Sequence, residues 1–132
     1  MAGESILIVD DNLRYLTLVR ALLTAEGYGV RTAVDAEEAL EVLKAFHPRL
    51  ILMDIQLPGM DGLELTRVLK TNTDTREMIV VAFSGSAIPK TEQNALDAGC
   101  EGYIAKPIDT RILIRLVAEY LQRVEQKNAP SP

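Results

Sequence analysis

Two kinds of apolar stretch alternate five times along the chain. Short runs such as residues 50–53 are apolar at every position, which is typical of strands buried on both faces of a parallel sheet. Between these runs, apolar residues recur every three or four positions, as Leu16, Val19 and Leu23 do, which predicts helices with one buried face. The expected strands are 5–10, 28–33, 50–54, 78–83 and 102–106, and the expected helices are 12–26, 36–46, 62–71, 90–98 and 112–124.

This alternation determines the class of fold that we expect. Repeated strand–helix units predict an α/β protein in which helices cover both faces of a parallel sheet. The chain has 132 residues, enough for one domain, which we expect to span residues 1–125. Residues 126–132 contain two prolines and are expected to form a flexible C-terminal tail.

Composition and charge exclude several classes of protein. The net charge of −5 argues against direct binding to nucleic acid, which requires clustered lysine and arginine. No stretch approaches the roughly 20 apolar residues of a membrane span. A single cysteine and an N-terminus unlike a signal peptide favour a cytoplasmic protein.

Polar residues follow the apolar runs at the point where the strands are expected to end. Ligands of open α/β sheets bind at the carboxyl ends of the strands. An isolated acid in such a position is more often a helix N-cap or a turn former. Here, however, four of the five expected strands deliver a polar group to the same edge, which favours a functional site formed by Asp10, Asp11, Asp54, Ser84 and Lys106.

The charges of this group predict a metal ion. Asp10, Asp11 and Asp54 bring −3 and Lys106 brings +1, so a divalent cation would neutralise the residual −2. The ligands at hand are oxygens, which favours Mg²⁺, with Mn²⁺ possible, over zinc. We expect Asp11, Asp54 and the backbone carbonyl of Gln56 to bind the ion, and Asp10 to act through a water.

Asp54 is the expected nucleophile of the site. A carboxylate can attack phosphorus and form an aspartyl phosphate. Such a transfer mainly requires positioning and neutralisation of the phosphoryl oxygens, which Lys106, Ser84 and the metal would provide. Asp54 is the best candidate because it stands alone on the central strand.

The motifs together resemble those of one family, the receiver domains of bacterial two-component response regulators. The resemblance covers about residues 4–125 and includes residues 8–12, 53–62 and 102–107, together with Ser84. Residues 54–58 and 99–104 are also similar to those of the single-domain cell-cycle regulators. The family implies a flavodoxin-like (βα)5 doubly wound sandwich with strand order 2-1-3-4-5, and phosphorylation of Asp54.

The resemblance also implies a signalling role for the domain. A sensor histidine kinase or a histidine phosphotransfer protein would donate the phosphoryl group in phosphorelay signal transduction. Ser84 and Tyr103 would then switch conformation together and change the binding of a downstream protein target. The Lys106–Pro107 peptide bond would be cis.

A docking surface for partners is expected around the first helix. Helical geometry directs Arg14, Leu18 and Ala21 away from the core and places Tyr15 on the flank. Arg14, Tyr15, Leu18 and Pro107 are the expected partner contacts. An isolated exposed leucine is also common without any function.

Two alternatives to a signalling switch remain open at this point. A phosphohydrolase with an aspartyl-phosphate intermediate also places an Asp at a strand end, but usually needs a second Asp two residues later, where this chain has Gln56. We therefore expect a phosphoacceptor domain and not an enzyme with turnover. A degenerate receiver used only for dimerisation is disfavoured by the intact acidic set. Whether the domain stands alone or belongs to a larger protein is left open.

Overall fold

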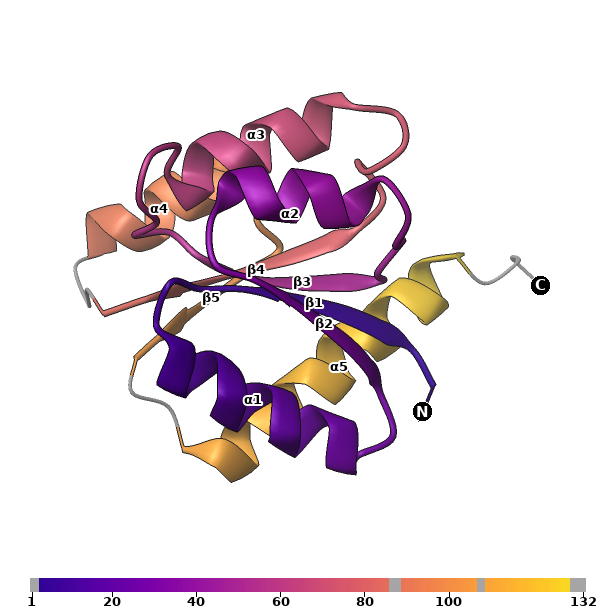
Figure 1. Cartoon of the computed structure of the whole chain (residues 1–132). Helices are drawn as coiled ribbons and strands as arrows, with labels where there is room; N and C mark the ends of the chain where they lie inside the picture. The colour runs from indigo at the N-terminus through magenta and orange to yellow at the C-terminus, as the bar shows by residue number, and fades with distance from the viewer. Residues whose placement is uncertain (1–2, 86–88, 107–108, 129–132) are drawn as a thin grey trace.

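In the part of the chain that the structure describes, five strands and five helices alternate (Figure 1). The computed structural model describes residues 3–85, 89–106 and 109–128. Within these ranges, no helix has the length and apolar character needed to cross a membrane. The elements are β1 (Ser5–Val9), α1 (Leu13–Ala25), β2 (Gly29–Ala33), α2 (Ala36–Leu43), β3 (Leu50–Asp54), α3 (Gly62–Thr71), β4 (Ile79–Ser84), α4 (Pro89–Ala98), β5 (Gly102–Ala105) and α5 (Thr110–Asn128).

The strands form one parallel sheet in the order β2-β1-β3-β4-β5. Helices α1 and α5 cover one face, and α2, α3 and α4 cover the other (Figure 1). Both the predicted fold class and the predicted strand order are confirmed. In the register of the central strands, Val9 lies beside Met53, and Asp54 lies beside Phe83. The ends of β1 and β3 therefore lie at the same edge of the sheet.

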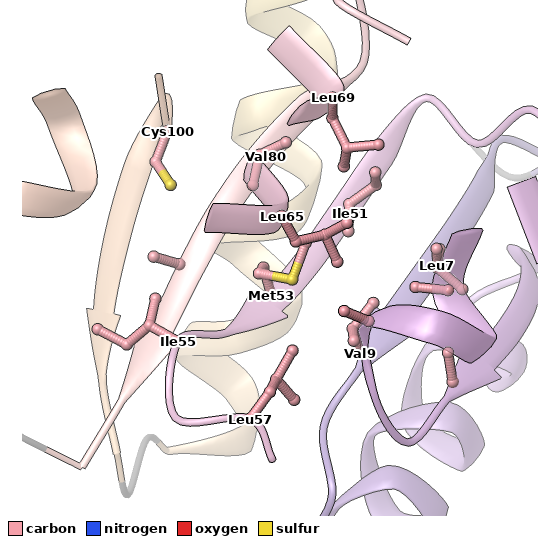
Figure 2. Packing of buried hydrophobic residues seen from close by; sticks show 14 of the residues in the cluster. Leu7, Val9, Ile51, Met53, Ile55, Leu57, Leu65, Leu69, Val80 and Cys100 are labelled. Carbon is pink, nitrogen blue, oxygen red and sulfur yellow. The ribbon is translucent and has the colours of Figure 1, made fainter. Parts of the chain in front are cut away.

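Each face of the sheet has its own apolar layer, because successive strand residues point to opposite faces. Ile6 and Ile8 pack under α1 and α5, where Leu16, Val19 and Leu23 meet them as predicted. Leu7 and Val9 belong to the opposite layer, which Figure 2 shows together with the following members: Ile51, Met53, Ile55, Leu57, Leu65, Leu69, Val80 and Cys100.

Helices α1, α2 and α3 each begin at a side chain that accepts a hydrogen bond from the backbone of the first turn. Asn12 accepts from the Tyr15 amide, Asp35 from the Glu38 amide and Asp61 from the Glu64 amide. An acid shortly after a strand thus acts as an N-cap at Asp35, which follows β2, whereas Asp61 caps α3 after a loop. At β1 the cap is Asn12, so Asp10 and Asp11 are not needed to begin α1.

The ends of two helices differ from the sequence prediction. Helix α2 ends at Leu43, and the backbone tightens into a turn in which the Lys44 amide donates to the Glu41 carbonyl. Helix α5 reaches Asn128, so residues 126–128, predicted to lie in a flexible tail, are helical. Glutamine and lysine are good helix formers, and their propensity outweighs the weak signal of the approaching prolines. Residues 129–132 lie outside the described ranges.

Candidate functional site

Three carboxylates meet at the carboxyl edge of the sheet. Asp10 directly follows β1, and its backbone amide still donates to the Ala33 carbonyl of β2 at 3.0 Å, which holds it in line with the strand. Asp54 is the last residue of the central strand β3. Asp10 and Asp54 are buried, with 2% and 4% exposure, whereas Asp11 is exposed. One carboxylate oxygen from each of the three lies within 4.8 Å of the others.

Lys106 joins this cluster from the end of β5. Its Nζ lies 2.6 Å from Asp10 Oδ2 and 3.5 Å from Asp54 Oδ2. Its backbone amide donates to the Ser84 carbonyl at 2.7 Å, which extends the β4–β5 ladder to the edge of the sheet. The fold therefore brings together Asp10, Asp11, Asp54 and Lys106, which the sequence analysis had grouped from their strand-end positions alone.

The buried carboxylates have different hydrogen-bond partners. Asp10 Oδ1 accepts from the Asn12 amide at 2.9 Å and Oδ2 accepts from Lys106, so both of its oxygens are engaged. Asp54 Oδ1 accepts from the Gln56 amide at 2.9 Å, while its Oδ2 is only in ion-pair range of Lys106. Of the four oxygens on these two carboxylates, Asp54 Oδ2 therefore has the weakest contact, at 3.5 Å from Lys106 Nζ.

Burial raises the pKa of the Asp54 carboxyl above its ordinary value. The hydrogen bond from the Gln56 amide acts in the opposite direction, the charge of Asp10 raises the pKa further, and the charge of Lys106 lowers it. Added positive charge at this edge would favour the ionised form of Asp54.

The donor set fits a hard divalent cation. Three carboxylates and one ammonium leave negative charge in excess, and all of the ligand atoms in the cluster are oxygens. Cys100 is buried in the layer under α3, where desolvation raises its pKa to about 11, and His47 is exposed before β3 begins. Asp11 and Asp54 are the residues best placed to bind such a cation directly, because Asp10 is already occupied by Lys106.

Ser84 and Tyr103 lie on the face of the sheet that α2, α3 and α4 cover. Ser84 ends β4 and is fully buried, and Tyr103 on β5 is half-buried against that apolar layer. Ala82 lies beside Tyr103, and Ala105 lies beside Ser84, so strand alternation directs both side chains to one face. The joint movement of these two residues stays a prediction.

Comparison with known proteins agrees with this geometry. The model of the response regulator receiver domain matches residues 6–118. The polar-differentiation response regulator DivK of Brucella ovis is 40% identical over 118 residues, which are 89% of this chain and 96% of DivK. The chain belongs to the response regulator receiver domain family.

Solved structures of other receiver domains superpose closely on this one. A CheY-like receiver domain protein from Methanospirillum hungatei has a TM-score of 0.88 at 32% identity, covering 96% of this chain and all of that one. The receiver domain of the sensor histidine kinase PA1611 from Pseudomonas aeruginosa, solved with a magnesium ion in its active-site cleft, has a TM-score of 0.83 at 31% identity, covering 92% of this chain and 99% of that one.

Tyr15 was placed by the sequence analysis on the flank of α1, among the docking residues. In this receiver domain its half-buried ring packs against Phe83, with ring centroids 5.9 Å apart, and under Lys106, whose Nζ lies 4.6 Å from the ring centroid. Tyr15 thus contacts the site itself. Helical periodicity indicated its flank position but carried no signal for the lysine, which is distant in sequence.

The other expected docking residues lie on the outer side of α1. Leu18 is 47% exposed and lines a shallow groove with Leu13, Arg14, Thr17 and Ala21. Pro107 and its peptide bond to Lys106 lie outside the described residues, so the predicted cis bond stays a prediction.

Proposed function

We propose that Asp54 is the phosphoacceptor of this receiver domain and that its phosphorylation controls the binding of a downstream protein. The observation that carries the proposal is the buried Asp54 carboxylate beside both Lys106 and two further acids. Asp54 Oδ2 lacks the short hydrogen bond that Lys106 makes to Asp10, so it is the buried carboxylate oxygen most available for attack.

The reaction would transfer a phosphoryl group from a phosphohistidine of a sensor histidine kinase or a histidine phosphotransfer protein. An oxygen of Asp54 forms a bond to phosphorus, and the phosphorus–nitrogen bond of the donor breaks, with its electron pair leaving on the imidazole. Lys106 neutralises charge on the phosphoryl oxygens, and Ser84 is proposed to donate a hydrogen bond to one of them. Mg²⁺, held by Asp11, Asp54 and the Gln56 carbonyl, would supply further neutralisation.

The proposed output is a change in the conformation of Ser84 and Tyr103, and with it in the surface on the β4–β5 side of the domain. A phosphoryl group on Asp54 adds acceptor oxygens that Ser84 reaches only by moving toward them. Space freed beside β4 would be filled by the ring of Tyr103, and the surface formed by α4, β5 and α5 would then select a different partner. Structures with and without a beryllofluoride mimic test this coupling, and an unchanged Tyr103 rotamer would contradict it.

The test of the phosphoacceptor is labelling by acetyl phosphate and Mg²⁺, followed by intact-protein mass spectrometry. We expect one phosphoryl group on the wild type and none on Asp54→Asn. Asp35→Asn is a matched control, because Asn also caps helices and the α2 cap is not among the site residues. Labelling of Asp54→Asn at another residue would refute the assignment.

Labelling by acetyl phosphate, combined with an assay for phosphomonoester hydrolysis, distinguishes a signalling switch from an enzyme. A signalling domain takes up a single phosphoryl group, whereas a phosphohydrolase would turn over a phosphomonoester such as p-nitrophenyl phosphate. Gln56, two residues after Asp54, offers an amide and no titratable group for acid–base catalysis. We therefore expect stoichiometric labelling without turnover of the phosphomonoester.

A further inference from the structure

The ring of Tyr15 forms one wall of the phosphorylation site. Tyr15 lies in the first turn of α1, and its ring meets the Phe83 ring at an angle of 72°, edge to face. Phe83 is the β4 neighbour of Asp54 and directly precedes Ser84. The edge-to-face contact fixes the plane of the Tyr15 ring relative to the two central strands.

The ring is a third neighbour of the Lys106 ammonium, after Asp10 and Asp54. An ammonium has three donors. Asp10 Oδ2 takes one at 2.6 Å, Asp54 Oδ2 lies at 3.5 Å, and the centroid of the Tyr15 ring lies at 4.6 Å. A cation is attracted to the face of an aromatic ring at this distance. Without the ring, the short bond to Asp10 would be the main restraint on the ammonium.

We propose that Tyr15 is a positioning residue, whose ring holds the Lys106 ammonium at the site where Asp54 accepts the phosphoryl group. The inference rests on the proposed phosphorylation of Asp54. It gives Tyr15 a role in the transfer step itself, through Lys106, in addition to any part in docking.

The ring and not the hydroxyl carries this role. The Tyr15 hydroxyl is buried and has no hydrogen-bond partner among the residues that the structure describes. The contacts to Phe83 and Lys106 are both made by the ring. A phenylalanine would keep both contacts, whereas a leucine would remove both.

The test compares Tyr15→Phe and Tyr15→Leu in the full chain, with acetyl phosphate as donor at saturating Mg²⁺. We expect Tyr15→Phe to be phosphorylated within about twofold of the wild-type rate. Tyr15→Leu should be about 2- to 30-fold slower at saturating donor with little change in KM, the range that a lost cation–π contact allows. A wild-type rate in Tyr15→Leu, or an equal loss in Tyr15→Phe, would overturn the inference. Tyr15→Met, whose longer, unbranched side chain adapts better to an irregular space, replaces the leucine variant if that variant does not fold.

Two controls separate positioning from general packing. In a Lys106→Ala background, Tyr15→Leu should cause no additional loss of rate, because the ring acts through the lysine. Tyr28→Leu removes another buried tyrosine of the same apolar layer, just before β2, and should leave the rate unchanged. An additional loss in the first case, or an equal loss in the second, would show that packing alone is responsible.

The outcomes also distinguish this inference from the proposed function. If the wild type is not labelled at all, the proposed phosphorylation fails and the positioning role fails with it. If the wild type is labelled and Tyr15→Leu reacts at the same rate, only the role of Tyr15 is wrong.

Discussion

The buried carboxylate of Asp54 lowers the stability of the folded chain. The carboxylate is buried beside Asp10, and the same burial raises its pKa. Lys106 offsets part of this repulsion, but its short contact goes to Asp10. The charged form of Asp54 is therefore less stable in the folded chain than in water, as is common for groups whose role is chemical.

Replacing Asp54 by Asn should stabilise the metal-free protein at neutral pH. Because the folded pKa is raised, the folded chain holds the Asp54 proton more tightly than the unfolded chain does, and stability falls as pH rises from the unfolded pKa through the folded one. At pH values above the folded pKa of Asp54, the full loss of stability is present. We expect Asp54→Asn to raise the free energy of unfolding at pH 7 by about 1–2 kcal/mol, the scale of a poorly paired buried polar group.

The pH dependence serves as the control for this effect. Near pH 3, below the ordinary pKa of about 3.9 for Asp, the carboxyl is protonated in both states and the two proteins should differ little. Urea denaturation in the presence of a chelator measures both values. A stabilisation of the same size at pH 3 and pH 7 would show that charge is not its origin.

Helix α1 presents different side chains to the site and to solvent. Tyr15 packs against Lys106 on the inner flank, while Leu13 and Leu18 are exposed on the outer side, with 66% and 47% exposure. Because Asn12 caps the helix directly after Asp11, the outer groove begins beside the acidic cluster. Under the proposed function, a donor protein would have to bring its phosphohistidine to this edge, and contacts with α1 would orient it.

Leu18→Asp should slow phosphotransfer from the donor protein by at least about tenfold, the effect of losing about 1.4 kcal/mol of binding. Phosphorylation by acetyl phosphate should stay unchanged, because Leu18 does not line the acidic cluster. Val68→Asp is a matched control, since Val68 is 41% exposed on α3, which covers the opposite face of the sheet. Equal slowing in both variants would mean that the effect is not specific to α1.

Helix α3 begins in direct contact with β3, the strand that ends at Asp54. A Cβ atom added at Gly62 would overlap the Asp54 carbonyl oxygen and lie 2.7 Å from Ile55 Cα, both of which are backbone atoms. The Gly62 amide also donates to the Ile55 carbonyl at 3.2 Å. Glycine is therefore required at the start of α3 by close approach.

Gly62→Ala should destabilise the protein by about 1–3 kcal/mol, the cost of overpacking a tight site. It should also slow the phosphorylation of Asp54, because the backbone of that residue must move to make room. Gly29→Ala is the control, since the nearest atom to an added Cβ there is Ser5 Oγ at 4.0 Å. Thermal unfolding and acetyl phosphate labelling measure both effects, and an unchanged Gly62→Ala variant would contradict the contact.

At the scale of the whole molecule, the sheet assembles a cluster of charged side chains from separate segments. Asp10 and Asp11 come from the end of β1, Asp54 from β3 and Lys106 from β5. Only the folded chain brings these charges together, so a cation that binds them stabilises the fold by mass action.

Mg²⁺ should therefore raise the melting temperature of the wild type, by an amount that corresponds to about 2.7 kcal/mol when its concentration is 100 times the Kd. Asp11→Ala should lose most of this gain, because Asp11 is the exposed carboxylate of the three and is expected to bind the ion directly. Differential scanning fluorimetry across a Mg²⁺ titration provides the measurement. An equal gain in Asp11→Ala would assign the effect to another site.

The sequence alone determined the class of fold and most of the site. Short runs that are apolar at every position, such as residues 50–53, are typical of strands buried on both faces, and their alternation with amphipathic helices specifies the layers. Asp54 and Lys106 could be grouped because parallel strands end at one edge. Local periodicity also placed Leu18 outside and Leu16 inside, as the structure has them.

The tertiary structure decided which partner each side chain contacts. Lys106 lies closer to Asp10, 96 residues away in the sequence, than to Asp54, and Tyr15 lies under the same lysine. Periodicity predicts which face of a helix or strand is buried. It does not predict which side chain from a distant element will contact that face. Such pairings follow from the packing of α1 on the sheet, which is a property of the assembled fold and not of any one segment.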